Sequence, residues 1–132
     1  MSARENLQTA RAFLKALEDF DVAALPSFFA PDAEQTEWPN RLKPKGDKRS
    51  PAQMIADFER ARGILVSQRY DVTSEIANDD MVAIEFVWTG KLAIPIGSLA
   101  AGDEMRGHCA VVMEFRDGVI IRQRNYDCFD AF

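Results

Sequence analysis

The chain has 132 residues, 47% of them hydrophobic, which suits one domain whose core needs neither disulfides nor a metal ion. Its net charge of -5 argues against nucleic acids and anionic membrane surfaces as partners. The sequence has no uncharged apolar run of the roughly 20 residues that a membrane helix needs, and no signal-peptide apolar region. We therefore expect a cytoplasmic protein with a single domain over residues 1–132.

The N-terminal segment predicts two helices. Ser2 and Glu5 have the spacing of a capping box, and Asp21 is a suitable N-cap for a second, short helix that Pro31 ends. Apolar residues recur at helical spacing in the first helix, and these are Leu7, Ala10, Phe13, Leu14 and Leu17.

A short strand is expected over residues 33–38, with Trp38 facing the interior and Glu37 pointing the other way. The polar segment that follows contains five basic residues, Arg41, Lys43, Lys45, Lys48 and Arg49. This loop either lies over a pocket mouth and attracts an anionic substrate, or it is only solvated.

A third helix is predicted from residue 50. Ser50 is its N-cap, Pro51 occupies the first helical position, and Gln53 completes a capping box. The helix should bury the apolar stripe formed by Met54, Ile55, Phe58, Ala61 and Leu65. From Ser67 onward the apolar residues alternate with polar ones, which predicts strands for the rest of the chain.

The turn at Asp117-Gly118 decides which side chains of the last two strands face the interior. A three-residue loop places Phe115 opposite Val119, whereas a two-residue turn places Met113 opposite Arg122. We prefer the first register because it separates apolar from charged residues better. The inner face then carries Cys109, Val111, Met113, Phe115, Val119, Ile121, Gln123, Asn125 and Asp127, and the outer face carries Arg106, His108, Glu114, Arg122, Arg124 and Tyr126.

Three helices followed by a run of strands predict an α+β fold with the helices on one side of a curved, mixed or antiparallel sheet. This order resembles the nuclear transport factor 2-like superfamily, in its SnoaL-like and ketosteroid isomerase-like branch. The resemblance is carried by Phe29-Ala30-Pro31-Asp32-Ala33, Glu37-Trp38-Pro39-Asn40-Arg41-Leu42, Val87-Trp88-Thr89-Gly90, Phe115-Arg116-Asp117-Gly118-Val119-Ile120 and Asn125-Tyr126-Asp127-Cys128-Phe129-Asp130. It implies a cone-shaped α+β barrel with three N-terminal helices, an apolar pocket, a homodimer, and chemistry without an organic cofactor.

Two reactions known on this fold lack their residues here. A likeness to the ketosteroid isomerases would require a tyrosine and two aspartates at the positions of Phe13, Trp38 and Val111, so steroid isomerisation is not expected. A likeness to limonene epoxide hydrolase would require an Arg-x-Asp pair on a central strand, which residues 84–89 lack. It would also require an aspartate on the last strand, at the position of Asn125. If the alignment is shifted by one residue pair, Asp127 takes that position.

Asp127 and Asn125 are the candidate catalytic residues. A carboxylate facing an apolar cavity loses hydration, which raises its pKa and makes Asp127 a usable acid or base. Asn125 could then position a water molecule or polarise a carbonyl group. In the structural alternative, Asp127 caps the end of the sheet and pairs with Arg41 or Arg62.

The pocket wall is expected to include Phe13, Trp38, Phe58, Phe86, Val111, Met113 and Gln123. His108 is the sole histidine and should lie on the outer face as a hydrogen-bonding residue. Cys109 and Cys128 have no metal-ligand spacing and are expected to be reduced packing residues, so no metal site is predicted.

Two functions of different classes remain open. One is a cofactor-independent isomerase, cyclase or hydrolase that acts on a small apolar substrate by acid–base chemistry. The other is a non-catalytic domain for small-molecule binding or dimerisation. A protein-docking adaptor would in addition require a large exposed apolar patch.

Overall fold

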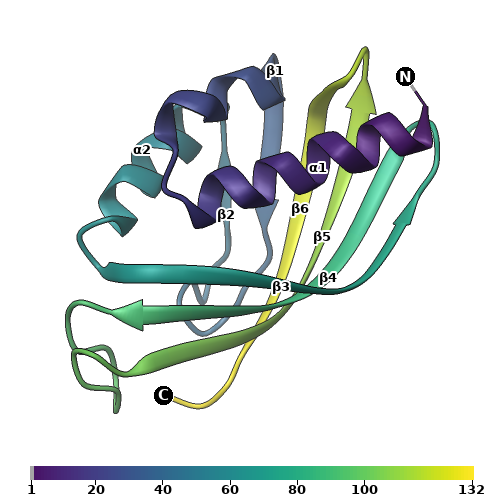
Figure 1. Ribbon diagram of the computed structural model, residues 1–132. Helices are drawn as coiled ribbons and strands as arrows, with labels where there is room; N and C mark the ends of the chain where they lie inside the picture. The colour runs from purple at the N-terminus through teal and green to yellow at the C-terminus, as the bar shows by residue number, and fades with distance from the viewer. Residues whose placement is uncertain (1) are drawn as a thin grey trace.

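The computed structural model describes residues 2–132 and contains three helical segments and six strands. In chain order these are α1 (Ala3–Glu18), η1 (Val22–Phe28), β1 (Phe29–Glu37), β2 (Asp47–Arg49), α2 (Pro51–Ala61), β3 (Leu65–Ala77), β4 (Met81–Leu92), β5 (Glu104–Arg116) and β6 (Val119–Phe129). All three helices lie on one side of a strongly curved sheet, and α1 crosses its concave face (Figure 1).

The sheet is mixed and open. Its strand order is β2-β1-β6-β5-β4-β3, in which β1 runs parallel to β6 and every other neighbouring pair is antiparallel. The α+β class predicted from the sequence is therefore confirmed. The predicted barrel is wrong in detail, because β2 and β3 remain separate edges. Only α1 and η1 precede the first strand, whereas α2 follows β2, so the expectation of three N-terminal helices is also partly wrong.

The two α-helices begin where the capping boxes predict. The Ser2 and Ser50 side chains accept from the backbone N–H groups of Glu5 and Gln53, whose side chains accept in return from the serine N–H groups. The second helix differs from the prediction, because Asp21 makes no side-chain cap and the segment is a 3₁₀ helix. Pro26 inside this segment cannot donate to an α-helical ladder, which favours the short form.

The β5–β6 hairpin combines a two-residue turn with a bulge. Asp117 and Gly118 both have positive φ, and Arg116 pairs with Val119, so the preferred three-residue loop is wrong. Phe115 then pairs with Ile120 but Glu114 pairs with Arg122, which leaves Ile121 as one extra residue on β6. Beyond the bulge, the β6 side chains face the sides of the sheet that the sequence predicted. The inner residues of β5 therefore pair with residues 123, 125 and 127.

The core lies between α1, η1 and the inner face of β4, β5 and β6. The helix α2 contributes no fully buried residue, although Met54, Ile55 and Phe58 are half-buried against the core. An amphipathic helix normally buries its apolar stripe against the core. Incomplete burial of this stripe points to a hollow beneath α2. No helix within residues 2–132 is both long and apolar enough to cross a membrane.

Candidate functional site

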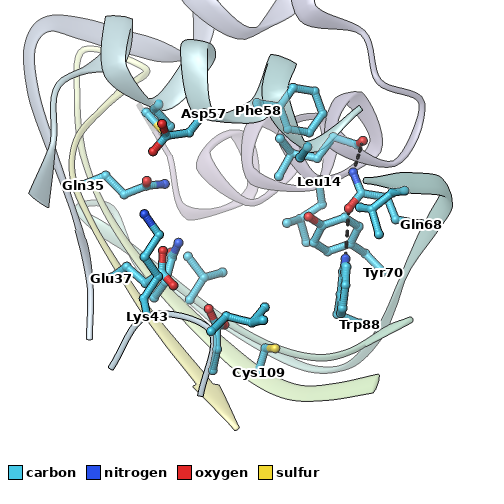
Figure 2. A pocket seen from close by; sticks show the side chains of 18 of the residues that line it. Leu14, Gln35, Glu37, Lys43, Asp57, Phe58, Gln68, Tyr70, Trp88 and Cys109 are labelled. Carbon is cyan, nitrogen blue, oxygen red and sulfur yellow. Dashed lines mark hydrogen bonds between the residues drawn. The ribbon is translucent and has the colours of Figure 1, made fainter. Parts of the chain in front are cut away.

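The hollow is a cavity of about 470 Å³ between the helices and the concave face of the sheet. Figure 2 shows two contrasting walls. Leu14, Phe58, Tyr70 and Trp88 lie on one side, and polar side chains that include Gln35, Glu37, Lys43 and Asp57 lie on the other. A ligand with an apolar body and one polar end matches this division.

We call the side of the cavity that Phe58, Tyr70 and Trp88 form the aromatic wall. A buried glutamine fixes the position of Trp88 in it. Gln68 donates from Nε2 to the Leu17 carbonyl oxygen at 2.6 Å, and its Oε1 accepts from the Trp88 indole N–H at 2.9 Å (Figure 2). Tyr70 packs against Phe86 with ring centroids 5.2 Å apart. The tryptophan orientation is therefore set by hydrogen bonding as well as by packing.

The polar wall is organised by Arg49, whose side chain is only 9% exposed. Its guanidinium donates to Asp57 at 2.7 Å, to Gln35 at 2.9 Å and to Glu37 at 2.5 Å. Asp47 also lies 3.2 Å from its Nε atom. A buried charge needs such partners to offset its lost hydration, and here the guanidinium fixes two cavity-lining carboxylates in place.

Neighbouring cations complete this group. Lys43 lies 3.1 Å from Asp47, and Arg60 pairs with Asp57. The carboxylates of Glu37, Asp47 and Asp57 are thus matched by Lys43, Arg49 and Arg60. Of these six charged groups, Glu37, Asp57, Lys43 and Arg49 line the cavity, whereas Asp47 and Arg60 support them from outside it.

Asp127 lines the same cavity, and among residues 2–132 it has no ion-pair partner. Burial raises its pKa above the ordinary aspartate value, and the negative charge of Glu37 raises it further. A hydrogen bond from the Cys109 thiol and the charge of Arg49 act in the opposite direction. Neither Arg41 nor Arg62 pairs with Asp127, so the structural alternative is not found.

Tyr70 lines the cavity from β3, and its ring lies on the aromatic wall (Figure 2). Burial raises the pKa of its hydroxyl, and the negative charge of Asp127 raises it further. The Tyr70 hydroxyl therefore stays protonated across the physiological range and can donate a hydrogen bond to a ligand.

Two amides extend the polar region beside Asp127. Gln123 donates from Nε2 to Asn125 Oδ1 at 3.0 Å, and both residues line the cavity. The Oε1 atom of Gln123 is buried and has no partner within residues 2–132. An unpartnered buried acceptor costs free energy, which a ligand or a water molecule that donates to it would recover.

Five of the seven expected wall residues line the cavity, and these are Phe13, Phe58, Phe86, Val111 and Gln123. Met113 does not, because it is 0% exposed and packs within the core. Trp38 does not either, because it is 43% exposed and its ring packs beside that of the outer-face residue Tyr126, with the ring centroids 6.3 Å apart. Asp127 and Asn125 both line the cavity, as their predicted parity requires.

The error at Trp38 comes from the pairing of β1. Gln35 pairs with Gln123 and Glu37 pairs with Asn125, so these two β1 residues share the inner face. The prediction that Glu37 points away is therefore wrong, and Trp38, one residue further along, projects to the other side. The partner strand β6 lies far away in the sequence, so the local pattern of β1 carried no information on this register.

His108 lies on the outer face, where Nε2 is 3.0 Å from Asp130. Of the five basic loop residues, Lys43 and Arg49 line the cavity. Arg41 instead lies over the Phe132 ring at 5.2 Å, and Lys48 lies 3.9 Å from Glu34. This loop is therefore neither a free cationic rim nor wholly solvated.

Tyr70, Asp57 and the inward direction of Glu37 were not anticipated from the sequence. The alternation of β3 was a signal for Tyr70, since it indicates one face for this residue, but nothing local indicates a hollow rather than a packed core. The part of the chain that the structure describes contains no group of three or more His, Cys, Asp or Glu arranged to hold a metal ion.

The family model for the SnoaL-like domain matches residues 10–123. Among curated proteins, no sequence matches this chain significantly. AclR of Streptomyces galilaeus, described as a candidate hydroxylase, is 17% identical with a TM-score of 0.79, and the match covers 96% of this chain and 76% of AclR. IdmH of Streptomyces antibioticus, described as a candidate polyketide cyclase, is 19% identical with a TM-score of 0.78 over 92% and 91% of the two chains.

A third similar structure is a candidate polyketide cyclase from Xanthomonas campestris pv. campestris. It is 22% identical, and its TM-score is 0.75 over 94% of this chain and 90% of its own. At these identities the three structures establish the shared fold.

Proposed function

We propose that this chain, which belongs to the SnoaL-like domain family, is a cofactor-independent enzyme that transfers a proton to or from a small, mostly apolar substrate. Candidate cyclases among its structural neighbours are compatible with such chemistry. The reaction class comes from the arrangement of the cavity, because a fold shared at this level does not by itself determine function.

The observation that carries the proposal is the isolation of Asp127. The other cavity-lining carboxylates, Glu37 and Asp57, are bound to Arg49, whereas Asp127 faces the cavity without a cationic partner within residues 2–132. Because burial raises the pKa of Asp127, its carboxylate is a stronger base than an exposed aspartate.

The neighbouring groups have complementary roles in this proposal. Asp127 removes a proton from a carbon or oxygen atom of the substrate and returns it at another position. The Tyr70 hydroxyl donates to the oxygen atom on which negative charge develops, and the Asn125 amide orients that end of the substrate. Phe58 and Trp88 hold the apolar body and exclude water.

A general probe of a desolvated base tests this proposal. In 5-nitrobenzisoxazole, a base removes the C3 proton while the N–O bond breaks, and the product is a coloured cyanonitrophenolate. Turnover by the wild-type protein should fall at least about 100-fold in Asp127→Asn. It should fall about tenfold in Tyr70→Phe, which removes one hydrogen-bond donor to the phenolate oxygen.

The matched control is Asp130→Asn, which removes a carboxylate from the exposed side of the same chain segment. This variant should keep the wild-type rate. If Asp127→Asn and Asp130→Asn were both as active as the wild-type protein, Asp127 would not be the base.

The second candidate function is non-catalytic binding of an apolar ligand. It is favoured by the saturation of Arg49 and Gln68 within the protein, which leaves the apolar wall as the main contact surface. This function predicts tight binding of aromatic probes in wild-type protein and Asp127→Asn alike, without turnover of the benzisoxazole.

We also propose a homodimer built on the outer sheet face, where Trp38 and Tyr126 expose adjacent rings. Exposed aromatic residues are enriched at protein interfaces. Light scattering coupled to size-exclusion chromatography should give twice the monomer mass for the wild-type protein and the monomer mass for Tyr126→Arg. A monomeric wild-type protein at micromolar concentration would contradict the dimer.

A further inference from the structure

Trp88 forms part of the aromatic wall and is held on three sides. Its indole N–H donates to Gln68 Oε1 at 2.9 Å. Its ring meets the Phe129 ring edge to face, with centroids 6.1 Å apart. Both aromatic residues line the cavity, so the position of this indole sets part of the cavity boundary.

The third side depends on Gly90. A Cβ atom added at Gly90 would lie 2.5 Å from two atoms of the Trp88 ring and 2.9 Å from Leu65. The indole therefore occupies the space that any other residue at position 90 would fill. Because Gly90 has no side chain, the Trp88 indole can lie against the sheet and does not project further into the cavity.

Gln68 connects this wall to the first helix. It is buried, and its amide donates to the Leu17 carbonyl oxygen at 2.6 Å while it accepts from Trp88 (Figure 2). One side chain thus fixes the indole relative to the C-terminal turn of α1. A rigid wall discriminates between ligands by size more strongly than a mobile wall, because the mobile wall moves to admit the larger ligand.

We propose that Gln68, acting through Trp88 above Gly90, sets the upper size of the ligand that the cavity accepts. This inference rests on the proposed function for its ligand, a small and mostly apolar molecule. Gln68 is a positioning residue, and Trp88 is the residue that contacts the ligand.

Binding of a graded series measures this discrimination without any reaction. The probes are 1-indanone, 9-fluorenone and benzanthrone, which have two, three and four fused rings and one carbonyl oxygen each. The readout is the ratio of the dissociation constants for benzanthrone and 1-indanone. Trp88→Ala removes the wall and should lower this ratio about tenfold, whereas Gly90→Ala displaces the indole into the cavity and should raise it.

Gln68→Met keeps the length of the side chain but loses both hydrogen bonds, so it should lower the ratio by several-fold. Trp88→Phe removes the N–H donor together with part of the ring that forms the wall, so it should lower the ratio at least as much. The double variant Gln68→Met with Trp88→Phe should lower the ratio little further than Trp88→Phe alone, because both changes break the hydrogen bond between Trp88 and Gln68. Gln8→Met on the exposed side of α1 is the matched control and should leave the ratio unchanged.

A spectroscopic readout accompanies the binding series. In a Trp38→Phe background Trp88 is the only tryptophan, and its indole N–H should exchange slowly with solvent in the parent and faster after Gln68→Met. Faster exchange together with the altered ratio supports the proposal.

The proposal is overturned if Gln68→Met and Trp88→Phe leave the ratio at the wild-type value, or if Gly90→Ala lowers it. It is also overturned if the wild-type protein binds none of the three probes. Loss of benzisoxazole turnover with size discrimination retained would instead contradict the proposed function alone.

Discussion

Cys109 and Asp127 lie directly opposite each other on β5 and β6, and both side chains line the cavity. The neighbouring Cys109 thiol lowers the pKa of Asp127, against the larger effect of burial. Burial raises the pKa of the Cys109 thiol, and the negative charge of Asp127 raises it further. A buried thiol with a raised pKa is a poor nucleophile.

Iodoacetamide should therefore distinguish the two cysteines. Cys128 is exposed, whereas Cys109 is buried. At pH 8 Cys128 should be alkylated at least about 100-fold faster, because only the accessible thiolate reacts. The measurement is mass spectrometry of Cys109→Ala and Cys128→Ala over time. Equal rates for the two single-cysteine proteins would contradict the assigned environment of Cys109.

Asp127→Asn should increase stability at neutral pH. Because burial raises the pKa of Asp127 in the folded protein, the folded state holds a proton that the unfolded chain has released only between the ordinary aspartate pKa and the raised one, and above both values the buried charge destabilises the fold. Stability then falls as the pH rises from the ordinary aspartate pKa through the raised one. Removing the charge should therefore raise the free energy of unfolding at pH 7.5 and leave it unchanged below pH 3, where both states are protonated.

Urea denaturation at several pH values measures this difference. Asp130→Asn is the matched control, and it should show no such gain because Asp130 is exposed and bound to His108. An Asp127→Asn protein less stable than wild type at pH 7.5 would mean that the carboxylate stabilises the fold.

Arg49→Met should destabilise the protein by about 3 to 5 kcal/mol, since it leaves the carboxylates of Glu37 and Asp57 without their shared partner. Arg60→Met removes an exposed partner of Asp57 and should cost less than about 1 kcal/mol. Thermal denaturation followed by circular dichroism compares the two variants. Similar melting temperatures for both would show that Arg49 contributes no more than a surface ion pair.

Gly118→Ala should cost about 1 to 2 kcal/mol, because φ at this position is 79°, where a Cβ atom approaches the following carbonyl oxygen. Gly63→Ala is the control, since its added Cβ would make only an ordinary contact at 3.6 Å. Chemical denaturation of both variants gives the difference. If Gly118→Ala were as stable as wild type, the two-residue turn would be in doubt.

Local features of the sequence were sufficient for several elements. The capping boxes at Ser2 and Ser50 identified both α-helices, because each cap involves residues only three positions apart. Alternation along β5 and β6 placed Asn125 and Asp127 on the inner face, although by the wrong turn. The preferred loop pairs Met113 with Ile121, whereas the observed turn and bulge pair it with Gln123. The two registers differ by an even number of residues, so the same β6 residues beyond the bulge face inward.

The tertiary structure decided the rest of the site. The inward direction of Glu37 depends on parallel pairing with Asn125, and the proximity of Tyr70 to Asp127 depends on the curvature of four strands. Arg49 finds its carboxylates on β1 and α2. Helix caps and strand alternation arise from interactions between near neighbours, so the sequence determines them alone. Strand register and the hollow beneath α2 arise from contacts between distant segments, so only the folded chain determines which side chains meet.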